Sequence, residues 1–361
     1  MTRWVIGMSG GVDSSLAAVL LGEAGEEVVG VSMKLWPCEG GAGGDPEDAC
    51  CSPGDARAVA LAHDIPHYVL DYEEPFRREV VDGFLAAYRA GETPNPCIAC
   101  NERLKFAHLW DWAHGIGASG VATGHYARVI EHQGRLYPGV PVDRDKDQTY
   151  FLFSLSQEQL ARARFPLGEL TKAQVRSEAA RRGLVTADKD ESMDLCFVGE
   201  EGVQDFLRQE MPEAFVPGDI VLQDDGRVLG QHRGVTGYTI GQRRGLGVAW
   251  REPLYVVAID LPCNRLILGS RAQLYVDRAI LRDCRWHHGP DVPPEGLFAL
   301  VRNRHRAKPV PATILPDGDG GAAVRYHEAV MRPSPGQACV VYDTDLQRCL
   351  GGGWFRLPDR V

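Results

Sequence analysis

The chain has 361 residues, enough for two or three domains with a large hydrophobic core. Its 44% hydrophobic and 24% charged residues are ordinary for a globular protein. No uninterrupted apolar stretch reaches membrane-spanning length, so we do not expect a membrane protein. The net charge of −10 hides an asymmetry, because residues 226–308 hold 14 Lys/Arg against 6 Asp/Glu and the remaining chain carries −18. Such a basic segment keeps nucleic acid among the expected partners.

The N-terminus points to a cytoplasmic protein. Met1–Trp4 leads directly into a predicted strand and leaves no room for a signal peptide. Ten cysteines without an export signal indicate a reducing compartment, where thiols serve chemistry, ligation or packing instead of structural disulfides.

The first predicted element is the apolar strand Trp4–Met8, followed by the loop Ser9-Gly10-Gly11-Val12-Asp13-Ser14-Ser15 and a helix over Leu16–Leu21. A glycine pair at a strand-to-helix turn lets backbone N–H groups approach phosphate oxygens, and the helix N-terminus adds a positive dipole. Asp13 is suited to hold a magnesium ion that bridges phosphates. A Walker-type motif is absent, so the loop instead resembles the pyrophosphate loop of ATP pyrophosphatases.

Strand and helix patterns then alternate. Further strands and helices are predicted at residues 28–32, 55–63, 67–70, 76–88, 104–114 and 120–123. The alternation predicts an α/β domain over residues 1–200, with a doubly wound parallel sheet covered by helices on both faces. Ligands in such sheets bind beyond the carboxyl ends of the strands, where the serine-glycine loop lies. The glycine-rich stretch 39–44 is predicted to be a loop.

The later part of the chain changes character. Capping boxes at Ser156-x-x-Gln159 and Thr171-x-x-Gln174 predict two short helices. From Val216 onward, strand-like runs alternate with turn residues, and we expect a small β-rich module over residues 201–272 and a β-barrel over residues 273–361. Strands are predicted there at 254–259, 265–268, 298–301, 310–314, 322–326 and 338–342.

Two segments place cysteines where they suit chemistry. In Thr93–Asn101, two prolines precede Cys97 and Cys100, and Lys105 follows. A thiol near a helix N-terminus and beside a lysine is expected to have a lowered pKa, and the thiolate is the nucleophile. In Asp190–Gly199, acidic residues surround Cys196, which suits a sulfur atom that is held until a partner attacks it.

Cys97-x-x-Cys100 alone leaves several interpretations open. It fits a redox pair, although the thioredoxin-like βαβ context is missing, or half a zinc site, although no second pair follows. With Cys196 it supplies three thiolates for an iron–sulfur cluster that leaves one iron open. It also fits a pair of helix-cap cysteines without chemistry.

The full ordered set of motifs resembles the tRNA-specific 2-thiouridylase family over essentially the whole chain. These ATP-dependent enzymes replace the C2 oxygen of the wobble uridine with sulfur. The matching segments are Gly7–Ser15, Thr93–Asn101, Ala122–Arg128, Lys146–Leu152, Leu195–Phe197, Tyr238–Gly247 and Gly351–Trp354. The first segment is shared with other ATP pyrophosphatases, whereas the full set in this order is specific to a much smaller group of proteins.

The resemblance implies roles for individual residues. Cys196 would carry a persulfide received from a sulfur-carrier protein, and Cys100 would attack that persulfide and end in a disulfide with Cys196. Some members have aspartate where this chain has Cys97, so Cys97 stays open as a proton carrier, cluster ligand or packing residue. ATP, with Mg²⁺ at Asp13, would bind Gly7, Met8, Ser9, Gly10, Gly11, Val12, Asp13, Ser14, Met33 and Gly124. The anticodon stem-loop of tRNA would contact Asn95, Pro96, Cys97, His125, Lys146, Asp147, Gln148, Asn303, Arg304 and Gln337, with the central module and barrel binding tRNA.

Two other functions share parts of this pattern. A small-molecule ATP pyrophosphatase, such as an amidating or argininosuccinate-type ligase, would have the first loop but would need neither Cys100 nor Cys196. A non-catalytic RNA-binding or cluster-bearing scaffold would leave the ATP loop vestigial. An iron–sulfur-dependent version of the thiolation is a variant of the main prediction.

Overall fold

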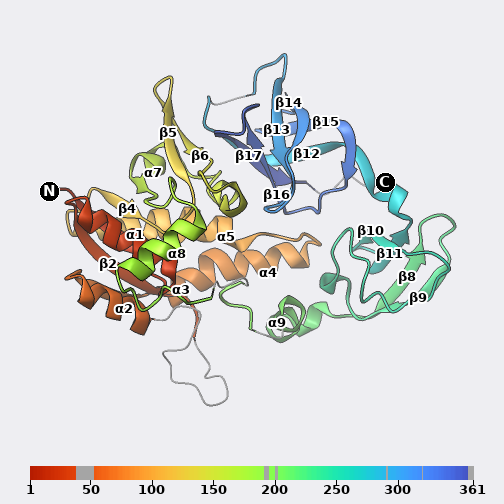
Figure 1. Cartoon of the computed structure of the whole chain (residues 1–361). Coiled ribbons are helices and arrows are strands. Elements are labelled where there is room, and N and C mark those ends of the chain that lie inside the picture. The colour runs from red at the N-terminus through yellow and green to blue at the C-terminus, as the bar shows by residue number, and fades with distance from the viewer. Residues whose placement is uncertain (38–52, 191–194, 200–201, 290–291, 319, 357–361) are drawn as a thin grey trace. The chain divides into compact units, whose positions relative to one another are not determined.

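The computed structural model describes residues 1–37, 53–190, 195–199, 202–289, 292–318 and 320–356 (Figure 1). The predicted loop at 39–44 lies outside the described residues. The chain forms two compact units, which are described separately. The first comprises Met1–Val81, Cys97–Phe197 and Asp345–Leu350, and the second comprises Asp82–Pro96, Val198–Thr344 and Gly351–Val361.

The first unit is built on a parallel sheet, in which the described residues form five strands in the order β3-β2-β1-β4-β7. The strands are β1 (Arg3–Gly7), β2 (Glu27–Lys34), β3 (His67–Asp71), β4 (Gly120–Ala122) and β7 (Ala163–Arg164). Trp4, Val5 and Ile6 of β1 are all buried, as expected for a central parallel strand covered on both faces.

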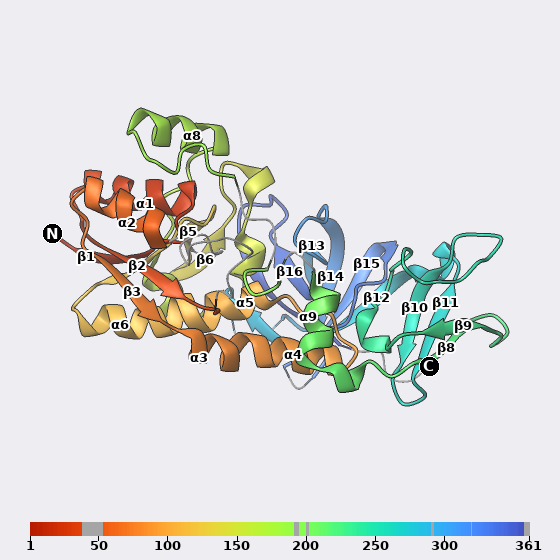
Figure 2. The same ribbon diagram turned by 90° about the horizontal axis from the view of Figure 1, so that it is seen from below.

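Helices cover both faces of this sheet, which confirms the doubly wound α/β prediction (Figure 2). Helix α1 and its neighbours α2 and α8 lie on one face, and α3 and α6 lie on the other. The helical segments of this unit are α1 (Val12–Glu23), α2 (Pro53–Ala62), α3 (Glu73–Phe76), the π-helical η2 (Arg77–Val81), α5 (Pro96–Ala99), the π-helical η3 (Cys100–His108), α6 (Leu109–Gly115), α7 (Gln157–Ala161) and α8 (Lys172–Arg181), with 3₁₀ turns η4 (Arg144–Lys146) and η5 (Thr149–Phe151).

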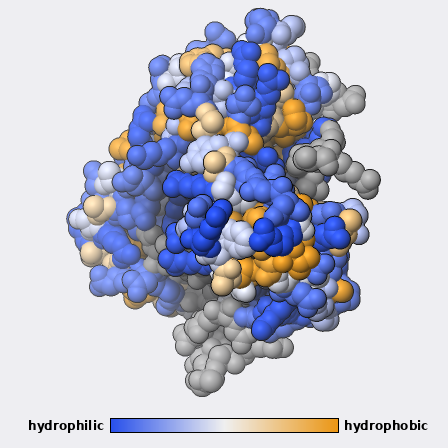
Figure 3. All heavy atoms as spheres, turned by 90° about the vertical axis from the view of Figure 1, so that its right-hand side faces the viewer, coloured by the Kyte–Doolittle hydropathy of each residue, from blue (hydrophilic) through white to orange (hydrophobic). Residues whose placement is uncertain are grey.

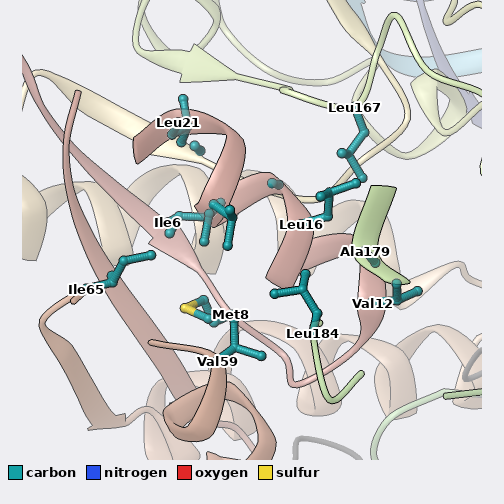
Figure 4. Close-up of a cluster of buried hydrophobic side chains, with 14 of the residues drawn as sticks. Ile6, Met8, Val12, Leu16, Leu21, Val59, Ile65, Leu167, Ala179 and Leu184 are labelled. Carbon is teal, nitrogen blue, oxygen red and sulfur yellow. The ribbon is translucent and has the colours of Figure 1, made fainter. Parts of the chain in front are cut away.

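The core beneath α1 holds this helix in place. Figure 4 shows Ile6 of β1 and Met8, which follows β1, meeting Leu16 of α1 and Val59 of α2 in one cluster of buried hydrophobic side chains. Leu16 is fully buried, and burying such a side chain stabilises the fold by about 1.5–3 kcal/mol.

Both predicted capping boxes are present: Ser156 and Gln159 cap α7, and Thr171 and Gln174 cap α8. The sequence analysis missed the hairpin β5 (Arg128–His132) and β6 (Arg135–Gly139), which turns at Gln133 and Gly134 with φ of 51° and 71°. Gln133 is a poor positive-φ residue, so the usual Asn-Gly or Asp-Gly hairpin signal is missing.

The second unit contains α4 (Asp82–Arg89), α9 (Val203–Glu210) and two β structures. Within the described residues, the first is a four-stranded sheet in the order β10-β11-β8-β9, in which only β11 and β8 pair in parallel. Its strands are β8 (Gly218–Leu222), β9 (Val228–His232), β10 (Tyr255–Asp260) and β11 (Arg265–Gly269), with 3₁₀ turns η6 (Pro212–Ala214), η7 (Val235–Gly237) and η8 (Arg271–Leu274).

The second β structure is a closed barrel, six-stranded in the described part of the chain, in the order β12-β15-β14-β13-β16-β17, as predicted for the C-terminal part. Its strands are β12 (Tyr275–Trp286), β13 (Leu297–Arg302), β14 (Val310–Pro316), β15 (Ala322–Met331), β16 (Ala338–Tyr342) and β17 (Cys349–Phe355). The molecular face drawn in Figure 3 is mostly hydrophilic, with hydrophobic residues in smaller clusters. No helix in the described residues is long and apolar enough to cross a membrane.

Candidate active site

The loop after β1 is held in a defined shape by its own serines. Ser14 Oγ accepts a hydrogen bond from the Ser9 backbone N at 3.1 Å and donates to the Gly11 carbonyl at 3.2 Å. Gly10 has a φ of +77°, a conformation that favours glycine. Because this loop ends at the first residue of α1, its backbone N–H groups and the helix N-terminus form a preorganised cradle for an anion.

Gly124, the second residue after the strand β4, packs against this cradle. A Cβ at residue 124 would stand 2.7 Å from the Ser14 backbone N and 2.8 Å from the Asp13 carbonyl carbon. The structure therefore brings Gly124 to the loop with which the sequence analysis grouped it. Met33 lies buried on β2, two residues beyond Val31, which pairs with Gly7 at the end of β1.

The carboxylate of Asp13 has two partners that the sequence analysis missed. Lys172 Nζ donates to both carboxylate oxygens, at 2.8 and 2.9 Å, and Tyr126 Oη donates to one of them at 2.8 Å. Tyr126 lies in a segment that the family resemblance matched, and Lys172 is the first residue of the helix predicted from the Thr171 capping box. A capping box marks the start of a helix but does not indicate where its first side chain points.

Asp13 fits the chemistry of a magnesium ion that is held mainly by a nucleotide. Mg²⁺ in such sites takes one or two protein carboxylates, several waters and phosphate oxygens. Asp13 offers one carboxylate beside the phosphate cradle, and Lys172 currently neutralises it.

The first pair of cysteines lies at the start of a continuous helical segment. Cys97 is the second residue of α5, and Cys100 begins the π-helical η3. Burial raises the pKa of the Cys97 thiol to about 11, with a further contribution from Cys100, and burial also raises the pKa of Cys100. Lys105 lowers both pKa values but is outweighed. The expected lowering of the thiol pKa was therefore wrong, because the sequence does not show how deeply this helix start is buried.

Lys105 links these thiols electrostatically to the residue after Gly124. Its charge lowers the pKa of Cys97, of Cys100 and of His125. His125 is buried, which is the larger reason that its pKa lies well below the usual value, and its Nδ1 stands 2.7 Å from Thr123 Oγ1. The imidazole is therefore neutral at physiological pH. The sequence predicted an effect of Lys105 on the thiols but none on His125.

Cys196 is anchored through the residue that follows it. Phe197 is buried, and its ring lies 6.0 Å from that of Trp36 and 5.7 Å from that of Phe76, in edge or tilted arrangements. The Arg77 guanidinium lies 5.7 Å from the centre of the Trp36 ring. Aromatic packing of this kind fixes one end of the Cys196 segment. Residues 191–194, on its other side, lie outside the described residues.

Within the described residues, the cysteines, Cys97, Cys100 and Cys196 among them, form no disulfide. Within those same residues, no group of three or more His, Cys, Asp or Glu side chains is arranged to hold a metal ion. In the described residues, Cys97, Cys100 and Cys196 are therefore not grouped as a set of cluster ligands.

The residues expected to contact tRNA differ in how they are held. Gln148 Oε1 accepts from the Tyr126 N at 2.8 Å, and buried Asp147 accepts from Thr149 N and Oγ1 at 3.0 and 2.6 Å. In the second unit, Asn303 Oδ1 accepts from Tyr326 Oη at 3.0 Å. Of the remaining positions, Pro96 is buried, Asn95 and Lys146 are half-buried, and Arg304 is exposed. The side-chain amide of Gln337 donates to the Thr93 carbonyl at 2.6 Å.

Models of known families match nearly the whole chain in three consecutive parts. Residues 2–200 match the tRNA methyl transferase HUP domain, residues 204–270 the tRNA methyl transferase PRC-barrel domain, and residues 276–355 the aminomethyltransferase beta-barrel domain.

Similar proteins span the full length of the chain. The chain is 46% identical over 359 residues to the tRNA-specific 2-thiouridylase MnmA of Herpetosiphon aurantiacus, covering 98% of each. It is 46% identical over 364 residues to the protein of that name from Chloroflexus aggregans, covering 99% of each. The solved NMN synthetase from Francisella tularensis matches with a TM-score of 0.33 and 19% identity over 52% of this chain and 66% of that one. By its full-length identity to these relatives, the chain belongs to the tRNA-specific 2-thiouridylase family.

Proposed function

We propose that this chain is a tRNA 2-thiouridylase that adenylates the C2 oxygen of the wobble uridine and then replaces it with sulfur from a cysteine persulfide. One observation carries the proposal. Gly124 packs on the phosphate cradle. The charge of Lys105 lowers the pKa of the next residue, His125, and also lowers the pKa of Cys97 and Cys100. The consecutive residues Gly124 and His125 are thus connected to the loop by a backbone contact and to the thiols by the charge of Lys105.

Adenylation explains the need for the loop. The C2 carbonyl of uracil belongs to a ring urea, which is a poor electrophile with a very poor leaving group. Attack of the C2 oxygen on the α-phosphate of ATP releases pyrophosphate and turns that oxygen into part of AMP, a stable leaving group. The cradle at Ser9–Ser14 would bind the phosphates, and Lys172, released from Asp13, would neutralise charge on the departing pyrophosphate. Mg²⁺ held by Asp13 would supply further charge neutralisation.

Sulfur transfer explains the need for two thiols. The Cys196 persulfide has the form Cys–S–SH, and the Cys100 thiolate attacks its inner sulfur. That attack forms a Cys100–Cys196 disulfide and releases hydrosulfide, which adds to C2 and expels AMP. In the alternative order, the persulfide attacks C2 first and Cys100 cleaves the S–S bond afterwards. Both routes give 2-thiouridine, AMP and one disulfide, which a cellular dithiol must reduce before the next turnover.

The raised pKa values give the resting enzyme a protected nucleophile. Because burial keeps Cys97 and Cys100 protonated at neutral pH, a bound persulfide is not attacked before the substrate arrives. Cys97 occupies the position of a proton-carrying aspartate in some family members. Because Cys97 is itself held protonated, it is not the base that takes the Cys100 proton.

On the RNA side, extrusion of a loop base costs only a few kcal/mol. Asn95, Pro96 and Cys97 would meet the uridine, and His125, Lys146 and the other residues matched by the family would contact the anticodon stem-loop. Residues 201–272 and 273–361 would bind the tRNA body, with exposed Arg304 on a phosphate. Such a substrate places the enzyme in the cytoplasm, where a sulfur-carrier protein would load Cys196.

The test is pyrophosphate release and 2-thiouridine formation on unmodified tRNA. We expect release to depend on tRNA, and Cys100→Ser and Cys196→Ser to abolish thiolation while ATP still binds. Cys263→Ser, which changes an exposed free thiol, is the matched control and should keep full activity. Full thiolation by either catalytic variant, or release driven by a free amino acid without tRNA, would overturn the proposal in favour of a different mechanism or a small-molecule ligase.

A further inference from the structure

The segment Gly91–Thr93, which precedes the cysteine-bearing helix, has contacts that the mechanism above does not use. Helix α4 ends in a Schellman arrangement, in which the Gly91 N donates to the Tyr88 carbonyl at 3.0 Å and the Glu92 N donates to the Ala87 carbonyl at 2.9 Å. Gly91 has a φ of +72°, as this motif requires. Glu92 is therefore held directly behind the end of α4.

Glu92 is a buried carboxylate with one strong cationic partner. Its exposed fraction is 8%, and Arg282 Nη2 of β12 donates to both of its oxygens, at 2.9 and 2.7 Å. Burial raises the pKa of Glu92 and Arg282 lowers it. A charge buried to this extent stays ionised only when a partner compensates for the lost hydration, so Arg282 determines how Glu92 is held.

Thr93 is held from three sides within the same unit. Its backbone N donates to the Pro335 carbonyl at 2.7 Å, its carbonyl accepts from Gln337 Nε2 at 2.6 Å, and its Oγ1 donates to Thr239 Oγ1 at 3.2 Å. Between the two barrel partners lies Gly336, where a Cβ would stand 2.8 Å from Glu92 Cβ. The turn before β16 is thus packed tightly against Glu92 and Thr93.

The chain that leaves this anchor is stiff. Thr93-Pro94-Asn95-Pro96 has proline at alternate positions, and each proline fixes its own φ and restricts the residue before it. Pro96 is also the first residue of α5, in which Cys97 is the second. A fixed Thr93 therefore limits where the helix carrying Cys97 and Cys100 can begin.

We propose that Arg282 and Glu92 are positioning residues for sulfur transfer, and that the barrel uses them to fix the chain directly before the reactive cysteines. This inference rests on the proposed function and adds residues that touch neither ATP nor uridine. Arg282 fixes Glu92 through its hydrogen bonds. Glu92 and the turn at Gln337 then hold Thr93 in place. The stiff proline-rich link after Thr93 in turn restricts the position of Cys97.

The test compares Arg282→Met, which removes the charge, with Arg282→Lys, which keeps it. We expect Arg282→Met to lower the kcat of thiolation about tenfold or more, as small misplacements of reacting groups do, with the KM for tRNA and the Kd for ATP within about twofold. Arg282→Lys should restore kcat to within about threefold. The matched control is Arg89→Met, which removes the exposed pair of Arg89 with Glu213 near the same α4 helix end and should change nothing.

Amide hydrogen exchange gives a readout that does not require activity. Faster exchange at residues 94–100 in Arg282→Met, and not in Arg89→Met, is expected. Should Arg282→Met fail to fold, Glu92→Gln, which keeps the shape of the side chain, takes its place. Unchanged kcat and exchange would show a merely structural pair, and a raised KM for tRNA with unchanged kcat would show a direct RNA contact; either overturns the inference. If the unaltered chain does not thiolate tRNA but amide exchange at residues 94–100 still rises in Arg282→Met, only the proposed function is overturned.

Discussion

At the scale of single residues, Lys105 is the charge that connects the thiols with His125. Burial dominates the pKa of Cys97 and Cys100, and the lysine partly offsets it. A buried thiol with one nearby cation is protonated at rest but needs less energy to ionise than an isolated buried thiol. Burial thus keeps the thiols protonated at rest, and the charge of Lys105 lowers the free energy needed to ionise them.

Removing this charge should slow thiol chemistry in a pH-dependent way. In Lys105→Gln, the thiolates lose a favourable charge, so the pKa of Cys97 and Cys100 rises further above the ordinary value. We expect slower alkylation of Cys100 by iodoacetamide at pH 8, with rates in both proteins rising as the pH increases toward the pKa. Mass spectrometry of the alkylated peptides measures the rate. Equal rates in the two proteins across pH 7–10 would rule out this role for Lys105.

Gly124 provides a second test at this scale. A Cβ there would collide with the backbone of Asp13 and Ser14, which has no flexible end that can move away. Gly124→Ala should therefore weaken ATP binding strongly, by about tenfold or more, as measured by calorimetry. Gly22→Ala is the control, because a Cβ at this α1 position meets nothing within 4 Å and should stabilise the helix by about 0.5–1 kcal/mol. ATP affinity that is equal in both variants would contradict the assignment of the loop.

At the scale of elements, the capping box of α8 has a functional consequence. Thr171 and Gln174 fix the first turn of the helix, and Lys172 on that turn reaches Asp13. We expect Thr171→Ala to cost about 1 kcal/mol of folding stability and also to weaken ATP binding. Ser156→Ala removes the equivalent cap from α7 and should cost similar stability without changing ATP affinity. Denaturant unfolding and calorimetry separate the two effects, and parallel losses of ATP affinity would argue against a role for the α8 start.

The elements also show what the sequence could and could not predict. Four of the five parallel strands, the two capping boxes and four of the barrel strands were predicted because apolar periodicity and turn residues mark them. The strand β7 has two residues, too few for periodicity, and β12 carries charges on many of its twelve residues, so neither was found. The structure places Gly124 against the loop. Lys172 was missed because only the fold brings it next to Asp13, 159 positions earlier in the chain.

Burial explains the remaining failure. The expectation of a lowered thiol pKa used the two local features visible in the sequence, a helix start and a lysine. The structure adds the enclosure of Cys97 and Cys100 by residues distant in the chain, and this outweighs both. Similarly, the local sequence around Glu92 is typical of a solvated charge at a helix end. Its partner Arg282 lies 190 positions later, so the pair is visible only in the folded chain.

At the scale of the whole molecule, charge is divided unevenly along the chain. Residues 226–308 carry a balance of +8 within a chain of net charge −10. RNA binding through this part should weaken steeply as salt rises, because bound phosphates release counterions. We expect the double variant Arg304→Ala/Arg306→Ala to reduce the slope of log affinity against log salt for tRNA by about one to two. The Kd for ATP should not change, and an unchanged slope would exclude these exposed arginines from the interface.

The central claim is that ATP cleavage and two cooperating thiols act in one reaction. Its most direct test is a single turnover with protein persulfidated at Cys196, unmodified tRNA and ATP, in the absence of reductant. Mass spectrometry should find 2-thiouridine, AMP, pyrophosphate and a Cys100–Cys196 disulfide in equal amounts. Formation of 2-thiouridine with Cys100 still a free thiol would contradict the account.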